Sequence, residues 1–453
     1  MIVMKFGGTS VGSAEAMEQV ISIVKSKLAR KPIVVASAMS KITDTLLQCA
    51  RLARDGQEAE ALGLIQNIVA KRHHEAAKKL VHDSLRQKLL IDALDKHLDE
   101  LKNLIHGLAI LGELSPRSLD AIASYGERLS TLILSVAMKE RGIAAELVDA
   151  RKIIVTDGNF TRAAPLVELS EPKAREIFLP IIKKGFVPVT QGFIGSTQEG
   201  ITTTLGRGGS DYSGAIIGAL LNVEEIEIWT DVDGILTTDP KTVSNARLLS
   251  TVTFQEASEL AYFGAKVLHP STILPAVEKN IPVHVYNTNR PESPGTHIVA
   301  REMSKSQTGG IKSIAYKKGI TVISIYSTRM LLAHGFLKSI FDIYDRFETS
   351  VDLVATSEVS VSLTIDDATH LEKIVNELKK FSTVSVEQKK AIVCLVGEQM
   401  KYTPGIAARV FNAIKDVNVN MIAQGASEIN VSFIVNEADV SMVVQKLHRE
   451  FFE

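Results

Sequence analysis

The sequence predicts an α/β protein in two parts: a largely parallel sheet sandwiched by helices, followed by two smaller βαββαβ modules. Three observations lead to this fold class. Strand-like and helix-like segments alternate through the first 300 of the 453 residues, which is typical of a parallel sheet with crossover helices. Amphipathic segments at 57–111 indicate a helical lobe beside that sheet. The remainder contains an internal repeat, which indicates paired modules.

Six short apolar segments, rich in Val and Ile, are expected to form the strands of the sheet. They lie at residues 2–6, 33–37, 153–155, 187–190, 226–230 and 283–286. The helical lobe is expected to bury a stripe of side chains that recur at helical spacing between charged residues. These are Leu85, Leu89, Leu94, Leu98, Leu101 and Ile105.

The composition changes near residue 300, where a turn-rich segment at 289–295 precedes a polar stretch that ends at Gly309 and Gly310. Clusters of such residues mark domain boundaries. We therefore expect one domain over residues 1–300. A linker that includes the first strand of the next domain is expected at 301–313.

The repeat places Gly335 and Phe336 in correspondence with Gly405 and Ile406, and a second matching pair of segments follows each helix. Each copy is expected to run strand, helix, strand, strand, helix, strand. The expected modules cover 314–388 and 389–453. Chance similarity between two amphipathic βαβ units is the alternative explanation.

The composition excludes several classes of protein. Lys and Arg number 51 against 52 Asp and Glu, so the net charge of −1 gives no general attraction to nucleic acid or anionic membrane. Cys49 and Cys394 lack the spacing of a disulfide framework or a zinc site. No secretion signal is visible at the N-terminus, and apolar runs are shorter than the ~18 residues of a membrane span. We expect a cytoplasmic protein.

The most informative segment is the glycine-rich loop at 204–211, TLGRGGSD. Its glycines allow the backbone N–H groups to approach a ligand, and an apolar small-residue helix is expected directly after it. Arg207 supplies a planar fork for a carboxylate or phosphate, and Asp211 adds a carboxylate. An anionic substrate site at a helix N-terminus is therefore expected.

A second candidate segment begins at Lys5, at the end of the first expected strand. Gly7, Gly8 and Thr9 follow it, and a helix is expected from about Ser13. A lysine with backbone N–H groups can hold a phosphate. The segment is not a P-loop, and two glycines after a strand are also a common turn, so both interpretations stay open for this segment alone.

Seven motifs follow one another over the first 300 residues. They are KFGGTSV at 5–11, SAMSKITD at 37–44, SYGERLS at 124–130, QGFIG at 191–195, the loop at 202–211, WTDVDG at 229–234 and FGAKVLHP at 263–270. In kind and order these motifs resemble those of the aspartate kinases in the amino-acid kinase superfamily, and the repeats that follow resemble the paired ACT domains of the same enzymes.

The resemblance implies transfer of a phosphoryl group from Mg-ATP to the side chain of L-aspartate, giving 4-phospho-L-aspartate, the first step toward lysine, threonine and methionine. The acceptor carboxylate is already ionised at neutral pH, so the enzyme needs orientation and charge neutralisation rather than a general base. By the same resemblance, the catalytic residues are Lys5, Arg207 and Asp211. The substrate-binding residues are Ser37, Thr43, Glu127 and Ser210, with Glu127 either pairing with the α-ammonium group or organising the neighbouring cations.

The resemblance also implies the ATP-binding residues. They are Lys5, Phe6, Gly7, Gly8, Thr9, Thr230, Asp231, Leu236, Lys241, Lys266 and Val267. Leu236 and Lys241 stand where family members commonly have Tyr and Arg, which leaves the contacts of that segment open.

No metal ligand is expected from side chains, because Mg²⁺ in such sites takes its ligands mainly from substrate phosphates. His73 and His74 lack the spacing of a zinc motif and are expected on a solvated helical face. His269 precedes Pro270 and is expected to end a turn.

The first repeat resembles the effector-binding module of lysine-sensitive aspartate kinases. The implied effector-binding residues are Met330, Gly335, Phe336, Leu337, Val351, Asp352, Thr356, Ser357 and Glu358. Asp352 and Glu358 favour a cationic effector, L-lysine, over threonine, although Ala333 departs from relatives that carry serine. The second repeat has Asn420 in place of Asp352 and is expected to form a subunit interface, in a homodimer or homotetramer.

Two alternatives to an aspartate kinase remain at the level of the sequence. One is another amino-acid kinase, of the glutamate type, and the other is a non-catalytic amino-acid sensor that retains the fold. The presence of Lys5, Glu127, Arg207 and Asp211 favours a kinase. The sequence reaches Glu453 without a dinucleotide-binding fingerprint, so we expect a monofunctional enzyme.

Overall fold

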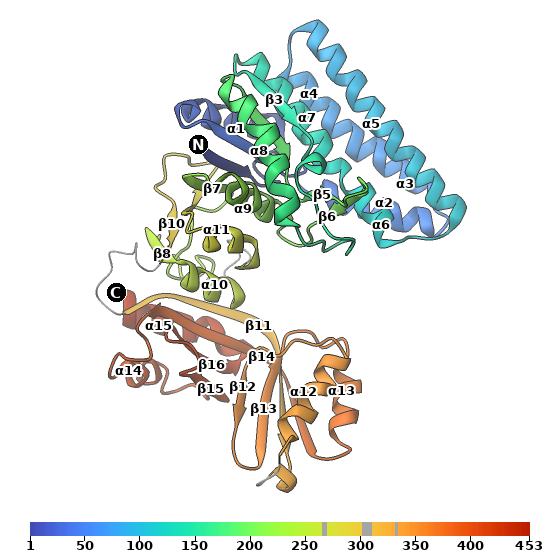
Figure 1. Cartoon of the computed structure of the whole chain (residues 1–453). Helices are drawn as coiled ribbons and strands as arrows, with labels where there is room; N and C mark the ends of the chain where they lie inside the picture. Colours follow the sequence, from blue (N-terminus) through green and yellow to red (C-terminus); the bar gives the residue numbers. More distant parts are fainter. Residues whose placement is uncertain (265–269, 301–309, 331–333) are drawn as a thin grey trace. The chain divides into compact units, whose positions relative to one another are not determined.

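The computed structural model describes residues 1–264, 270–300, 310–330 and 334–453, which divide into two compact units (Figure 1). The first unit comprises Met1–Ile235, Ser250–Phe254 and Val267–Ser304. The second comprises Leu236–Leu249, Gln255–Lys266 and Lys305–Glu453. Two short segments before residue 267 thus belong to the second unit. The domain boundaries expected from the sequence stay predictions.

An eight-stranded sheet in the order β3-β4-β2-β1-β7-β9-β10-β8 forms the centre of the first unit. Neighbouring strands are parallel except for the antiparallel pair β9 and β10, which confirms the largely parallel sheet. The strands are β1 (Ile2–Phe6), β2 (Pro32–Ala36), β3 (Ala145–Val148), β4 (Val187–Gln191), β7 (Glu225–Thr230), β8 (Thr251–Thr253), β9 (Val283–Asn287) and β10 (Thr296–Val299). A separate hairpin consists of β5 (Ile194–Ser196) and β6 (Thr202–Thr204).

The prediction of a strand at 153–155 is wrong. These residues follow a 3-10 turn, and Val155 makes only an isolated bridge to Ser196. The edge position belongs to β3, where Glu146 and Leu147 are exposed. An edge strand with so few buried side chains has a weak hydrophobic pattern, whereas 153–155 is apolar because other elements bury it.

Alternate residues of β1 face two different groups of helices, as the period of a strand requires. Ile2, Met4 and Phe6 join the apolar core formed with α1 (Ala14–Ser26), α4 (Lys71–Leu80) and α7 (Tyr125–Glu140). On the opposite face, Val3 and Lys5 lie against Gly214 of α9 (Gly209–Leu221). The sheet therefore separates an α1 face from an α9 face. α8 (Val167–Lys183) and α11 (Leu274–Glu278) also belong to this unit, whereas α10 (Phe254–Tyr262) lies in the second unit except for its first residue.

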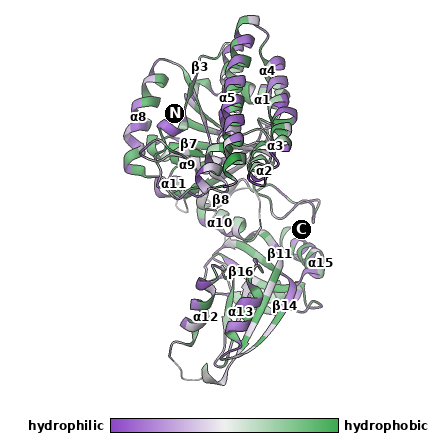
Figure 2. Ribbon diagram, turned by 90° about the vertical axis from the view of Figure 1, so that its right-hand side faces the viewer, coloured by the Kyte–Doolittle hydropathy of each residue, from purple (hydrophilic) through white to green (hydrophobic). Residues whose placement is uncertain are grey.

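The segment expected to form a helical lobe, 57–111, is helical, with a helix of 28 residues and shorter helices of 7 and 10 residues. The elements of the lobe are α2 (Ile42–Arg54), α3 (Glu58–Leu64), a π-helical turn at Ile65–Ala70, α4, α5 (Ser84–Leu111) and α6 (Pro116–Ala123). Figure 2 shows hydrophilic and hydrophobic residues interspersed along α5. Leu94, Leu98, Leu101 and Ile105 are buried as expected.

Three residues of the lobe depart from the expected burial. Leu85 and Leu89 are 66% and 60% exposed, because 3.6 residues per turn place them on the side of α5 opposite the buried stripe of Leu90, Leu94, Leu98, Leu101 and Ile105. His73 is fully buried, not solvated, and its Nδ1 lies 2.6 Å from the carbonyl oxygen of Val69. Burial lowers the pKa of His73 to about 4, so the imidazole is neutral.

The second unit contains a six-stranded sheet in the order β12-β13-β11-β14-β16-β15. Two long strands, β11 (Gly310–Tyr326) and β14 (Thr383–Glu398), pair along most of their length and run through both repeats. The first repeat adds α12 (Phe336–Arg346), β12 (Val354–Thr356), β13 (Ser360–Ile365) and α13 (Leu371–Leu378). The second adds α14 (Ile406–Ala413), β15 (Met421–Gln424), β16 (Asn430–Asn436) and α15 (Val440–Phe452).

The repeat is visible in the structure: Gly335 and Gly405 precede α12 and α14 in the same left-handed conformation, with φ of 84° and 78°. The second copy differs from the expected order, because no strand follows α15. The first half of β11 pairs with the second half of β14 and fills that place. None of the helices in the described ranges combines the length and hydropathy that a bilayer span requires.

Candidate functional site

A cavity of about 390 Å³ lies in the first unit at the carboxyl ends of β1 and β2. The N-terminal turns of α2, α7 and α9 converge on it. Helix N-termini carry unpaired N–H groups and partial positive charge, so three of them together favour an anionic ligand. Eight residues expected from the sequence line this cavity: Lys5, Gly8, Ser37, Thr43, Glu127, Arg207, Ser210 and Asp211.

Lys5 and Asp211 form an ion pair inside the cavity, with 2.5 Å between Nζ and Oδ1. Their side chains are only 8% and 17% exposed. Lys5 projects from the α9 face of β1, and Asp211 lies in the first turn of α9. The carboxylate therefore fixes the ammonium group where the strand ends, while one face of the group remains at the cavity.

The glycine-rich loop reaches the cavity through two left-handed residues, Gly206 and Gly208, with φ of 77° and 72°. Residues other than glycine are strained in this conformation, which explains why glycines stand on both sides of Arg207. Arg207 is exposed at the rim of the cavity. α9 begins at Gly209, so the expected helix N-terminus at this loop is present.

Glu127 is a buried carboxyl group on the first turn of α7, with 3% of the residue exposed. The backbone N–H of Ala38 donates to it, but its Oε2 has no hydrogen-bond partner within the described residues. Burial raises its pKa to about 8, so the group is largely protonated at neutral pH. A buried carboxyl group with an unpaired oxygen beside a cavity is poised to meet a cationic ligand group.

Two functional candidates were missed by the sequence analysis. Lys41 lines the cavity just before α2 and has a left-handed backbone, with φ of 67°. Arg72 of α4 donates from Nη1 to the carbonyl oxygen of Ser40 at 2.7 Å and from Nη2 to that of Gly12 at 2.9 Å. Lys41 lies inside a motif that was recognised, so a signal existed, whereas nothing in the sequence connects Arg72 to those loops.

Asp120 fixes the strand that leads into the glycine-rich loop. It is 1% exposed and accepts from the backbone N–H of Thr161 and of Thr204, each at 2.9 Å. The hydroxyl of Thr204 donates to it at 2.7 Å. Burial raises the pKa of Asp120, and these three hydrogen bonds oppose the rise. The loop is therefore anchored at its start as well as by α9.

The amino acid kinase family matches residues 1–287, and an ACT domain matches residues 393–451. Aspartokinase 1 (chloroplastic) of Arabidopsis thaliana is 40% identical over all of this chain and 80% of its own length. Lysine-sensitive aspartokinase 3 of Escherichia coli is 38% identical over all of this chain and 99% of its own length. The chain belongs to the aspartokinase family.

Solved aspartokinase structures agree with this assignment. E. coli aspartokinase III in complex with aspartate and ADP, in the R-state, matches all of both chains with a TM-score of 0.84 at 37% identity. The same enzyme in complex with lysine and aspartate, in the T-state, gives 0.83. Both the amino-acid kinase fold and the paired C-terminal modules expected from the sequence are confirmed.

The expected nucleotide residues of this aspartokinase do not all reach the cavity. Phe6 is fully buried and its ring stacks on Trp229 at 6.0 Å, so its side chain cannot touch a nucleotide. Thr9 and Asp231 are exposed in the first unit, and Lys241 is exposed in the second. Leu236 also belongs to the second unit, while Lys266, Val267 and His269 lie outside the described residues.

The expected effector residues of the aspartokinase lie in the first repeat. The two acidic residues among them, Asp352 and Glu358, differ in burial. The side chain of Asp352 is only 2% exposed, accepts from Tyr262 Oη at 2.7 Å and lies 3.5 Å from Lys317 Nζ. Burial raises its pKa, which Tyr262 and Lys317 oppose. Glu358 is exposed in the turn after β12, about 20 Å along an extended chain from Asp352. Met330 and Phe336 pack against the core of this repeat.

Proposed function

We propose that this chain is an ATP-dependent aspartate kinase that phosphorylates the side-chain carboxylate of L-aspartate. The observation that carries the proposal is that Lys5, Arg207 and the buried Glu127 line the same cavity. A dicarboxylate with an α-ammonium group needs cations for its acids and an anion for its ammonium, and these residues supply both. The bound complex of the E. coli relative with aspartate and ADP supports the same ligands.

Each residue has a specific part in the proposed reaction. Arg207 binds a carboxylate of aspartate, and Thr43 and Ser37 add hydrogen bonds. Glu127 ionises and pairs with the α-ammonium group. Lys5, held by Asp211, neutralises charge on the transferring phosphoryl group, and the N-terminal turns of α2 and α9 assist it. The acceptor carboxylate attacks phosphorus directly, so no general base is required.

Mg²⁺ is proposed to enter with ATP rather than at a side-chain cage. The carboxyl groups that line the cavity are Asp44, Glu127 and Asp211. Asp44 is exposed, Glu127 is largely uncharged, and Asp211 is engaged by Lys5. Such a set does not form an octahedral cage, and Mg²⁺ keeps water and substrate phosphates as its main ligands in sites of this kind.

The second unit is proposed to bind a feedback effector, L-lysine, in the first repeat. The lysine-sensitive E. coli relative supports this, and so does the buried carboxylate of Asp352. In this structure Lys317 supplies an ammonium group to Asp352, and a lysine effector would bring another. Because Asp352 precedes β12 and Glu358 follows it, the two carboxylates are far apart along the chain, and a site that uses both is expected to combine two copies of the chain. We therefore propose a homodimer or homotetramer.

The test is a coupled assay of ADP formation with the full chain, Mg-ATP and either L-aspartate or L-glutamate. With Mg-ATP, turnover is expected with L-aspartate and not with L-glutamate. Lys5→Met is expected to lower kcat by about 100-fold or more, because the positive charge that neutralises the transferring phosphoryl group is lost. Lys79→Met is the control, since Lys79 is exposed and forms an ion pair with Glu15 on the surface. Preference for L-glutamate would support the glutamate-type alternative, and absence of aspartate-dependent turnover would support the sensor.

A further inference from the structure

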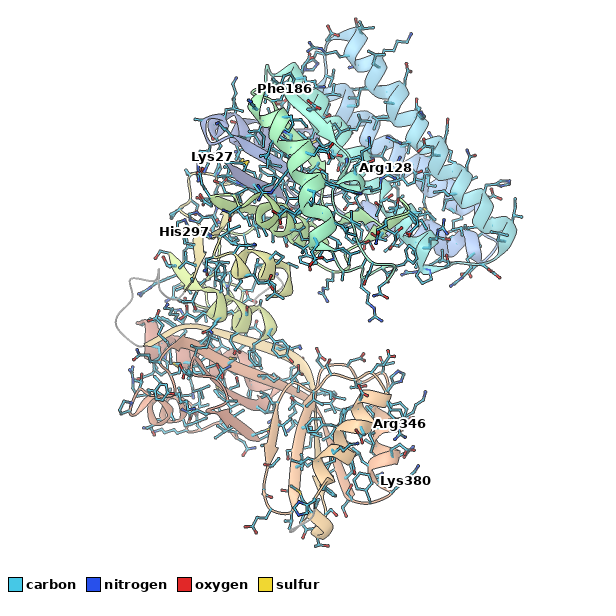
Figure 3. All side chains as sticks on the ribbon, viewed as in Figure 1. Lys27, Arg128, Phe186, His297, Arg346 and Lys380 are labelled. Carbon is cyan, nitrogen blue, oxygen red and sulfur yellow. The ribbon has the colours of Figure 1, made fainter. Side chains whose placement is uncertain are left out.

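A group of metal-ligating side chains lies on the α1 face of the first unit, away from the kinase cavity. Within the described residues, Glu225, His284 and His297 bring one ligand atom each to within 4.8 Å of one another. Glu225 begins β7, and His284 and His297 are directly opposite each other in the β9–β10 pair. Figure 3 labels His297, and also Lys27 at the end of α1.

One ring nitrogen of His284 faces more polar groups than it can form hydrogen bonds with. This atom, Nδ1, lies 2.6 Å from Glu225 Oε1, 2.9 Å from Tyr286 Oη and in hydrogen-bond contact with His297 Nε2. One nitrogen carries at most one proton and so donates to at most one of these partners. In every protonation state of the two imidazoles, at least one of these three contacts is therefore not a hydrogen bond. A cation at the centre would satisfy all of them together.

Glu225 is oriented so that one oxygen points at the imidazoles. Arg30 donates from Nη1 to Oε2 at 2.6 Å, which leaves Oε1 directed at His284. A partner that orients the second oxygen of a ligating carboxylate is the usual outer shell of a protein metal site.

We propose that Glu225, His284 and His297 bind a divalent transition-metal ion, Zn²⁺ by ligand type. Two imidazoles and one carboxylate suit this ion, and Tyr286 Oη or a water molecule can complete a tetrahedron. Bond lengths of about 2.0 Å place tetrahedral ligands roughly 3.3 Å apart. The observed 2.6 Å and 4.0 Å from Glu225 Oε1 to the two histidines bracket this value. Small rotations of exposed His297 are sufficient to reach it.

The proposed ion is structural and not part of phosphoryl transfer. Glu225 pairs with Ile2 at the start of β1, whereas Lys5 lies three residues further along and on the other face. The ion would join β7, β9 and β10, including the one antiparallel pair of the sheet. This proposal departs from the sequence analysis, which expected no side-chain metal ligand, because the three residues lie far apart in the sequence.

The experiment uses the full chain after treatment with a chelator. Wild-type protein is expected to bind one equivalent of Co²⁺ with the visible absorption of a tetrahedral site. Zn²⁺ should displace the Co²⁺ and raise the Tm. His297→Ala is expected to weaken Zn²⁺ binding by about 10-fold or more, measured by competition with a chromophoric chelator. Because His297 is 44% exposed, this variant should retain the fold, and unchanged aspartate kinase activity checks that it does.

His106→Ala is the matched control. His106 also faces a single carboxylate, Glu58, at 2.8 Å, but it is not part of a three-residue group. The His106→Ala protein is expected to bind Zn²⁺ as the wild type does. The proposal is overturned if wild-type protein gives no tetrahedral Co²⁺ spectrum, or if His297→Ala and His106→Ala bind Zn²⁺ equally well.

Discussion

Glu127 illustrates how a single residue can link ligand binding to proton transfer with solvent. Its carboxyl group is buried beside the cavity, and its pKa of about 8 keeps it protonated in the free enzyme at neutral pH. The α-ammonium group of aspartate would stabilise the ionised form and lower that pKa. Binding of substrate is therefore coupled to release of a proton, and the burial that makes Glu127 uncharged also makes its later ion pair strong.

At pH 7, binding of L-aspartate is expected to release up to about one proton in the wild type and none in Glu127→Gln. Isothermal titration calorimetry in buffers of different ionisation enthalpy measures this number. Glu127→Gln is also expected to bind aspartate more weakly. Glu176→Gln, an exposed carboxylate on α8, should behave as the wild type does. Equal proton release by the wild type and Glu127→Gln would contradict the assignment.

The same group sets a direction for stability against pH. A carboxyl group with a folded-state pKa raised from 4.5 to about 8 favours the folded state only while it is protonated. In this window the folded state binds more protons than the unfolded state, so stability falls as pH rises from about 5 to about 8. The Tm of ligand-free Glu127→Gln is expected to vary less over this range than that of the wild type.

At the scale of elements, the site depends on how closely helix ends approach the loops that follow strands. A Cβ atom on Gly126, in α7, would lie 2.7 Å from the Cβ of Ala38, which follows β2. Likewise, a Cβ on Gly192 would lie 2.7 Å from that of Ser210. These glycines let α7 and α9 bring Glu127 and Ser210 against the cavity, so their role is close packing.

Gly126→Ala is expected to lower the Tm and raise the KM for aspartate, because the added methyl group pushes α7 away from Ala38 at a cost of about 1–3 kcal/mol. Gly107→Ala is the control, since Gly107 lies inside α5 with no atom within 4 Å of the added Cβ. It should raise the stability by up to about 1 kcal/mol and leave the KM unchanged. Thermal unfolding and steady-state kinetics give both quantities; similar effects of the two substitutions would count against the packing explanation.

At the scale of the whole molecule, one hydrogen bond joins the regulatory repeat to a helix from the kinase-family part of the sequence. Tyr262 of α10 lies within the family match at 1–287, yet its hydroxyl donates to Asp352 in the first repeat. Both residues belong to the second unit. A ligand that changes the partners of Asp352 therefore acts directly on α10, which is a physical basis for feedback.

Tyr262→Phe is expected to raise the concentration of L-lysine needed for half-inhibition by about 10-fold, the effect of about 1.4 kcal/mol from one charged hydrogen bond. Activity without lysine should stay close to that of the wild type. Tyr402→Phe is the control, because Tyr402 donates to Glu428 at 3.0 Å in an exposed pair of the second repeat. The test is to measure inhibition by L-lysine for the wild type, Tyr262→Phe and Tyr402→Phe. An unchanged curve for Tyr262→Phe would exclude feedback through this hydrogen bond.

Much of the cavity could be predicted from the sequence, because glycine-rich loops and cations that follow strands have local signatures. Lys5, Arg207 and Asp211 were identified in this way and by family resemblance, and the structure places them around one cavity. Arg72 could not be predicted, since it acts through the carbonyl oxygens of loops distant in sequence. The prediction of a solvated face for His73 is wrong, because the sequence around His73 does not show which helices pack over it.

By itself, the sequence determined the class of fold, the family, the repeat and the chemical identity of the kinase loops. These depend on short-range periodicity, on glycine conformation and on motifs that remain contiguous in the chain. Only the tertiary structure decided that Glu127 is uncharged, that Asp352 is buried against Tyr262, and that Glu225 meets two histidines. Burial and the convergence of distant side chains arise from packing, which sets the local dielectric and the available partners, and no local segment encodes them.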